Sequence, residues 1–114
     1  VATSSANQCL YCMVSHGAFL RIRSKQPWLS DQIGANYREA EISERQMAML
    51  DYAVKLAQTP WLVGEEDIRA LEQVGFSEDE IWDIGAITGL FAMSNRLAAH
   101  TAMRPNDEFY GMAR

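Results

Sequence analysis

The stretch SEDEIWDIGAITGLFAMSNRLAA, residues 77–99, decides the fold class more than any other part of the chain. Ser77 followed by Glu80 is a capping-box pattern, and acidic residues in this first turn suit the positive end of a helix dipole. Beyond this turn, apolar residues recur at helical spacing in two stripes. The first stripe is Ile81, Ile84, Phe91 and Ala98, and the second is Trp82, Ala86, Leu90, Met93 and Leu97. Because a helix that is apolar on most of its circumference is buried on several sides, we expect a central helix or an oligomer interface.

The segments on either side of this stretch are also predicted to be helical. The predicted helices before it span residues 65–74, 43–58, 30–36 and 5–24. Gly75 is typical of a residue just beyond a helix end, and Pro27 ends the first helix. Capping-box patterns start two of them, at Ser43 and at Ser5. We expect an irregular tail after Arg104 and no strand, so the predicted fold class is all-α.

Composition and charge place the chain among ordinary globular domains. It has 114 residues, of which 48% are hydrophobic and 22% charged, which suits one domain. The net charge is −5 and the only basic stretch, residues 21–25, is too short to indicate nucleic-acid binding. No apolar run approaches the ~18 residues of a membrane span, and Val1–Ser5 lacks the features of a signal peptide. Two cysteines in such a chain favour a reducing compartment, so we expect a cytoplasmic protein.

Cys9, Cys12 and His16 form the pattern C-x-x-C-x-x-x-H. On a helix these three residues share a face with Phe19, which predicts two thiols and an imidazole at the head of an apolar stripe. A free thiol has a pKa of ~8.5, and a position near a helix N-terminus lowers it. An imidazole one turn away can accept the thiol proton, and one sulfur can condense with a sulfenic acid on the other. The pattern therefore predicts a redox-active cysteine pair.

Three other interpretations of the cysteines remain open. A structural disulfide across so short a loop would stabilise the fold by only ~2 kcal/mol, the low end of the usual range. A structural zinc site needs four ligands, and His100 is the only histidine besides His16. The cysteines can also be buried and inert. We prefer the redox interpretation because the histidine spacing fits it best.

The same residues resemble a known family. Residues 4–17, SSANQCLYCMVSHG, are similar to the core motif of the alkyl hydroperoxidase D-like (AhpD-like) proteins of the carboxymuconolactone decarboxylase superfamily. Residues 42–56, 74–81 and 91–97 are similar to the peroxidase-related branch. The resemblance implies an all-α bundle built around a helical hairpin, in one domain over residues 1–114 that lacks its N-terminal part. It also implies a homo-oligomer, with dimers, trimers and hexamers known in the family.

The resemblance also implies roles for the three residues. Cys12 is the peroxidatic cysteine, Cys9 is the more exposed resolving cysteine, and His16 belongs to a proton relay. A glutamate of the family motif would lie before Val1, and Tyr11 stands where some members have a histidine. Since the decarboxylase branch generally lacks the cysteine pair, its presence argues against lactone decarboxylation.

The activity that the resemblance implies is a thiol-dependent peroxidase. Its substrates would be alkyl hydroperoxides or hydrogen peroxide, and its reductant a dithiol of the thioredoxin-like or lipoyl type. We expect no cofactor, no metal and no binding to nucleic acid or membranes. Two alternatives stay open, a general thiol–disulfide oxidoreductase or redox sensor and a non-catalytic oligomeric fragment.

Overall fold

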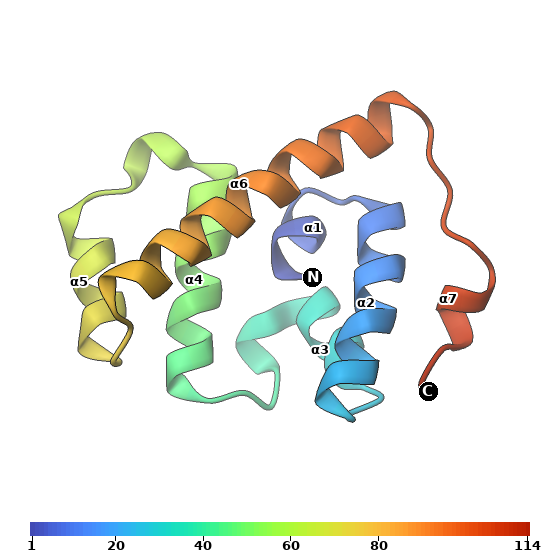
Figure 1. Ribbon diagram of the computed structural model, residues 1–114, viewed down its shortest axis with the longest axis horizontal. Coiled ribbons are helices and arrows are strands. Elements are labelled where there is room, and N and C mark those ends of the chain that lie inside the picture. Colours follow the sequence, from blue (N-terminus) through green and yellow to red (C-terminus); the bar gives the residue numbers. More distant parts are fainter.

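The computed structural model describes all residues 1–114 and contains helices only, which confirms the all-α class. The α-helices are α1 (Ala2–Ala6), α2 (Leu10–Ser24), α3 (Leu29–Asn36), α4 (Glu44–Gln58), α5 (Glu65–Gln73), α6 (Glu78–His100) and α7 (Glu108–Gly111) (Figure 1). Two short 3-10 helices, η1 (Tyr37–Glu39) and η2 (Pro60–Leu62), follow α3 and α4. The molecule measures 41 × 31 × 23 Å.

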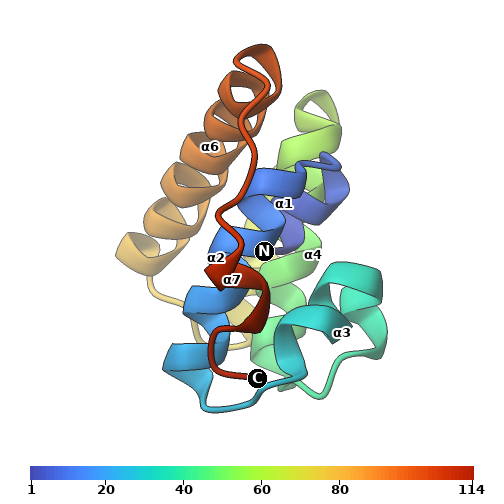
Figure 2. The same cartoon turned by 90° about the vertical axis from the view of Figure 1, so that its right-hand side faces the viewer.

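The main core forms where α1 packs between α3 and α4. Its buried residues are Ala2, Leu29, Ile33, Tyr37 and Ala40. Partly buried side chains from α2 and α4, including Leu20, Leu50 and Val54, complete it. Figures 1 and 2 show α1 in the middle of the molecule, with α6 crossing it on one side. The short helix α1 therefore lies inside, with longer helices around it.

Local signals place two helix starts and one helix end correctly. Ser43 with Gln46, and Ser77 with Glu80, both make the predicted reciprocal capping-box hydrogen bonds. Gly75 has a φ of +91° between α5 and α6, a conformation that L side chains rarely adopt. These signals succeed because each depends only on residues within one helical turn.

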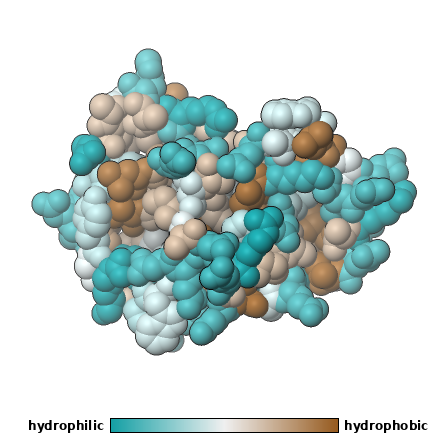
Figure 3. Space-filling model, turned by 180° about the vertical axis from the view of Figure 1, so that it is seen from behind, coloured by the Kyte–Doolittle hydropathy of each residue, from teal (hydrophilic) through white to brown (hydrophobic).

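The two apolar stripes of α6 have different environments. Ile81 and Ala98 of the first stripe are buried, with Ile84 and Phe91 partly so. The second stripe is exposed: Trp82 is 76% accessible, and Leu90, Met93 and Leu97 are all more than half accessible. The face of the molecule that is hidden in Figure 1 is seen in Figure 3, and it is mostly hydrophilic with separate apolar patches. The expectation of a helix central to the chain is therefore wrong, whereas an oligomer interface on α6 stays a prediction.

No helix here combines the length and the apolar character that crossing a bilayer requires.

The tail after Arg104 is not irregular as expected, because it contains α7 and packs against α2 (Figure 2). Arg21 of α2 anchors this segment, beside the ion pair of Arg114 with Asp31 of α3 at 2.7 Å. Its Nε donates to the Met112 carbonyl at 2.8 Å, its Nη2 donates to the Phe109 carbonyl at 2.7 Å, and its Nη1 donates to Ser30 Oγ at 3.0 Å. The guanidinium is thus buried, and two of its three partners are about 90 residues away in the sequence.

Candidate functional site

The chain breaks its helix just before the cysteines. α1 ends at Ala6, and Gln8 adopts a positive φ of 53° before α2 starts at Leu10. The prediction of one helix starting at Ser5 is therefore wrong, because Ser5 lies inside α1 and its hydroxyl donates to the Gly34 carbonyl. Cys9 is the N-cap residue of α2 instead. Its sulfur accepts the backbone N–H of Cys12 at 3.4 Å, so the C-x-x-C pair itself starts the helix.

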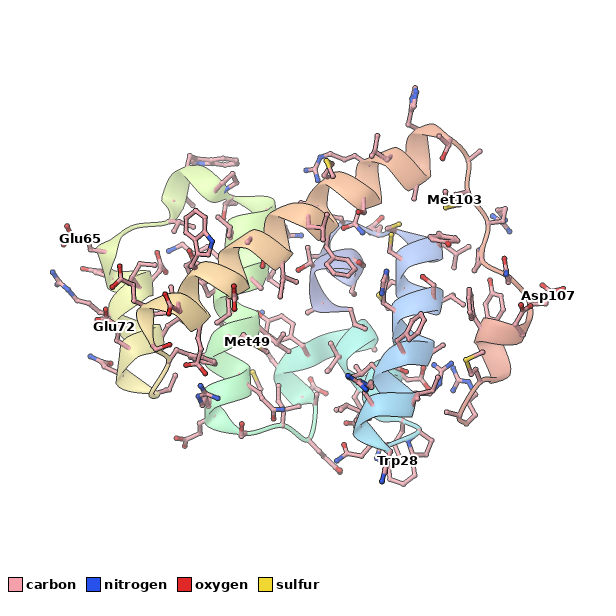
Figure 4. The ribbon with its side chains drawn as sticks, in the orientation of Figure 1. Trp28, Met49, Glu65, Glu72, Met103 and Asp107 are labelled. Carbon is pink, nitrogen blue, oxygen red and sulfur yellow. The ribbon has the colours of Figure 1, made fainter.

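Both thiols are free and buried where α2 meets α6. Cys9 is 7% and Cys12 2% accessible, and they pack with Ala98 of α6 and with Tyr11. A cavity of about 240 Å³ is lined by Cys9 but not by Cys12. Met103, labelled in Figure 4 beyond the end of α6, lines the same cavity. Cys9 is therefore the more accessible sulfur, and Cys12 lies deeper.

The electrostatic environment of Cys12 differs from the sequence expectation. Burial raises the pKa of its thiol, and a hydrogen bond with Cys9 raises it further. An opposing contribution comes from hydrogen bonding with the Asn95 side chain, which lowers this pKa. The expected lowering by the helix terminus is wrong for Cys12, because burial of the thiol away from water raises the pKa and is the largest contribution. Cys12 is thus predominantly protonated at neutral pH.

His16 lies one turn after Cys12, half-buried against α6. Its ring meets the Phe91 ring edge-on, with centroids 4.6 Å apart, and lies 6.2 Å from the ring of Phe19. Burial lowers the pKa of His16, so the imidazole is mostly neutral at pH 7 and able to accept a proton. It makes no hydrogen bond to either cysteine. The predicted shared face is only partly correct, since Phe19 is 55% accessible while Ser15 and Ala18 are buried.

One buried polar group of α6 also lies near the cysteines. Asn95 of α6 is 3% accessible, and its amide hydrogen-bonds to Ser4 and to Asn7 at the end of α1. The signal available in the sequence is a seven-residue spacing, because Ile81, Thr88 and Asn95 are all buried on one face of α6. An asparagine on a core-facing stripe must find buried partners, and here they are the residues that precede Cys9.

The described residues contain no group of three or more histidine, cysteine and carboxylate side chains that could hold a metal ion. His100, the second histidine, is exposed in the last turn of α6. A zinc site built from Cys9, Cys12 and His16 consequently has no fourth side-chain ligand here.

Two solved structures are similar to this chain over 99% of its length, each with a TM-score of 0.97. One is an uncharacterized peroxidase-related protein from Ralstonia eutropha JMP134, described as an alkylhydroperoxidase AhpD core, with 53% sequence identity. The other is an uncharacterized peroxidase-related protein from Silicibacter sp. TM1040, with 43% identity. The chain spans 60% and 59% of these two chains, respectively. No family model and no curated protein matches the chain.

Proposed function

Because the chain belongs to the AhpD-like peroxidase-related proteins, we propose that it carries the cysteine pair of a thiol-dependent peroxidase that reduces alkyl hydroperoxides or hydrogen peroxide. The observation that carries the proposal is the placement of two free thiols at the start of α2, one capping the helix and one buried below it. The Cys9 sulfur accepts the backbone N–H of Cys12, so the two thiols lie at one helix end, where a disulfide can form after a modest rearrangement.

In the proposed reaction the Cys12 thiolate attacks the terminal oxygen of the hydroperoxide. The S–O bond forms as the O–O bond breaks, which gives a sulfenic acid on Cys12 and an alkoxide that takes up a proton and leaves as the alcohol. Cys9, as thiolate, then attacks the Cys12 sulfur, and hydroxide leaves as water after taking up a proton. A dithiol donor reduces the resulting disulfide, so one hydroperoxide and one dithiol give one alcohol, one water and one donor disulfide.

The difference in accessibility supports this division of roles. Cys9 borders the 240 Å³ cavity, so a reductant can reach its sulfur once the disulfide has formed. Cys12 needs a base, because burial raises its pKa. We assign that role to the neutral imidazole of His16, which reaches the thiol proton through a water molecule or a side-chain rotation.

The proposed partners follow from the same site and from the surface of α6. The reductant is a dithiol of the thioredoxin-like or lipoyl type, and the free thiols suit a reducing compartment such as the cytoplasm. A homo-oligomer would cover the exposed stripe of Trp82, Leu90, Met93 and Leu97 on α6.

One observation favours a different candidate, a non-catalytic oligomeric domain. Buried cysteines in apolar surroundings have raised pKa values and react slowly, and Cys12 fits that description in this chain. A slow reaction of Cys12 with peroxide and with disulfides alike would support this candidate, whereas fast reaction with disulfides alone would indicate a general thiol–disulfide oxidoreductase.

A pair of matched substitutions tests the peroxidase. With organic hydroperoxide and excess dithiol, Cys12→Ser should abolish turnover while the circular dichroism spectrum stays that of a folded helical chain. Cys9→Ser should still consume one peroxide per chain and retain a sulfenic acid on Cys12 that dimedone traps. Peroxide turnover by Cys12→Ser at the rate of the unsubstituted chain would refute the proposed role of Cys12.

A further inference from the structure

Asn95 occupies the buried junction of α1, α2 and α6 with both ends of its amide oriented by hydrogen bonds. Its Nδ2 donates to Ser4 Oγ at 2.9 Å, and its Oδ1 accepts from Asn7 Nδ2 at 3.0 Å. Ser4 is fully buried and Asn95 is 3% accessible, so water cannot replace Ser4, whereas Asn7 is partly buried. The amide plane of Asn95 is therefore fixed from two sides.

The same hydrogen bonds lead directly to the cysteines. The carbonyl of Ser4 accepts the backbone N–H of Cys9 at 2.9 Å, which ties α1 to the N-cap of α2. Ala98, one turn beyond Asn95 on α6, packs against both cysteines. An asparagine amide has two N–H donors, and Ser4 uses one of them. Neither Ser4 nor Asn7 uses the second N–H, and Asn95 and Ala98 are both buried on α6, where Ala98 packs against the cysteines.

We propose that Asn95 is a positioning residue of the thiol site, whose amide, held by Ser4 and Asn7, directs an N–H at the Cys12 sulfur and favours its thiolate form. This proposal rests on the proposed function only for what the thiolate is used for. Whether Asn95 hydrogen-bonds to the Cys12 sulfur does not depend on peroxide being the substrate. The lowering of the Cys12 pKa by Asn95, against the effect of burial, agrees with this geometry. Asn95 does not contact the reacting oxygen and acts through the sulfur alone.

Few other ionisable groups lie around Cys12. Cys9 on α2 and the amino group of Val1 before α1 act on its pKa, and His16 lies one turn further along α2; from α6, the uncharged Asn95 also acts on it, and Ala98 packs against it. The test below keeps Val1 and His16 unchanged in every protein compared. A shift in the titration of Cys12 between those proteins then reports on Asn95.

The experiment measures the pH dependence of Cys12 alkylation by iodoacetamide in a Cys9→Ser background, where serine retains an oxygen as helix N-cap. Asn95→Ala should move the midpoint of the profile up by about one pH unit and slow alkylation at neutral pH by about tenfold, as expected for loss of one hydrogen bond to an ionised group. Asn95→Asp, which replaces the N–H by an acceptor, should move the midpoint further. Asn7→Ala, which removes a support of the amide and leaves Asn95 in place, should give a smaller upward shift.

A midpoint that stays the same in Asn95→Ala and Asn7→Ala, with only the melting temperature lowered, would overturn the proposal and leave Asn95 a structural residue. If Asn95→Ala does not fold, the midpoint in Asn7→Ala decides the question. Peroxide turnover by the unsubstituted chain is measured separately. Its absence together with a shifted midpoint would refute the peroxidase and leave the role of Asn95 intact.

Discussion

Replacement of Arg21 by methionine is expected to release the C-terminal segment from α2. Arg21 is 3% accessible, and its three hydrogen bonds hold the Phe109 and Met112 carbonyls and the Ser30 hydroxyl at 2.7 to 3.0 Å. Methionine keeps an apolar stem of similar length but donates nothing. Since α7 has only four residues, it has little stability of its own and depends on this docking.

The magnitude follows from these three bonds. A hydrogen bond that involves a charged group contributes roughly 1.5–3 kcal/mol, but the two carbonyls can reach water once α7 detaches, so their loss costs less than the full sum. We expect a local loss of about 2–4 kcal/mol, which would raise amide exchange in residues 104–114 by about 30- to 1000-fold where the docking limits exchange. Helices α4 and α6 should keep their protection, because Arg21 makes no hydrogen bond to either.

Hydrogen exchange followed by mass spectrometry is the assay, with Arg21→Lys as the matched control. Lysine keeps the charge and can satisfy fewer acceptors than the guanidinium, so its effect should be intermediate. Cys12 lies about 14 Å from Arg21 along α2, so its alkylation rate should not change. Unchanged exchange of residues 104–114 in Arg21→Met would refute the assignment of docking to Arg21.

Two further predictions concern stability. Gly75→Ala should destabilise the chain by about 1 kcal/mol, because φ is +91° at this position. Gly89→Ala should stabilise it by about 0.5–1 kcal/mol, because Gly89 is helical and no atom lies within 4 Å of the new Cβ. Urea denaturation measures both changes in the free energy of unfolding, and equal effects would contradict this reasoning. Hydrogen bonds from Lys55 and the Gly64 N–H hold the pKa of the Asp67 carboxyl below its usual value. The ionised Asp67 therefore stabilises the fold above the unfolded-state pKa of about 3.9, and this stabilisation is lost as the pH falls through the lower folded-state pKa. Asp67→Asn should therefore destabilise the chain at pH 7 and have little effect at pH 2, and a loss that is the same at both values would contradict this linkage.

Much of the fold could be predicted because its signals are local. The capping boxes at Ser43 and Ser77 and the glycine at position 75 each act within one turn. The start of α2 was missed because the same pattern at Ser5 is overridden by tertiary contacts, namely the hydrogen bond of Ser5 to Gly34 and the packing of α1 in the core. The helix at 108–111 was missed because Arg21, nearly 90 positions away, stabilises it.

The candidate site was predictable in composition but not in its environment. The C-x-x-C-x-x-x-H pattern identifies Cys9, Cys12 and His16, and the structure places all three near the junction of α2 with α6. The raised pKa of Cys12 depends on burial by α6, which spacing along α2 does not specify. Asn95 comes from a helix more than 80 positions away, so its proximity to the cysteines requires the tertiary fold.

The central claim, a peroxide-reactive cysteine pair, is tested most directly by the mass of the chain after a single turnover. The reduced protein is mixed with one equivalent of organic hydroperoxide in the absence of a dithiol, then alkylated and weighed by mass spectrometry. We expect one disulfide between Cys9 and Cys12 and one alcohol per chain. The Cys12→Ser variant should form no such disulfide. Two thiols that remain fully alkylated, with the peroxide unconsumed, would contradict it.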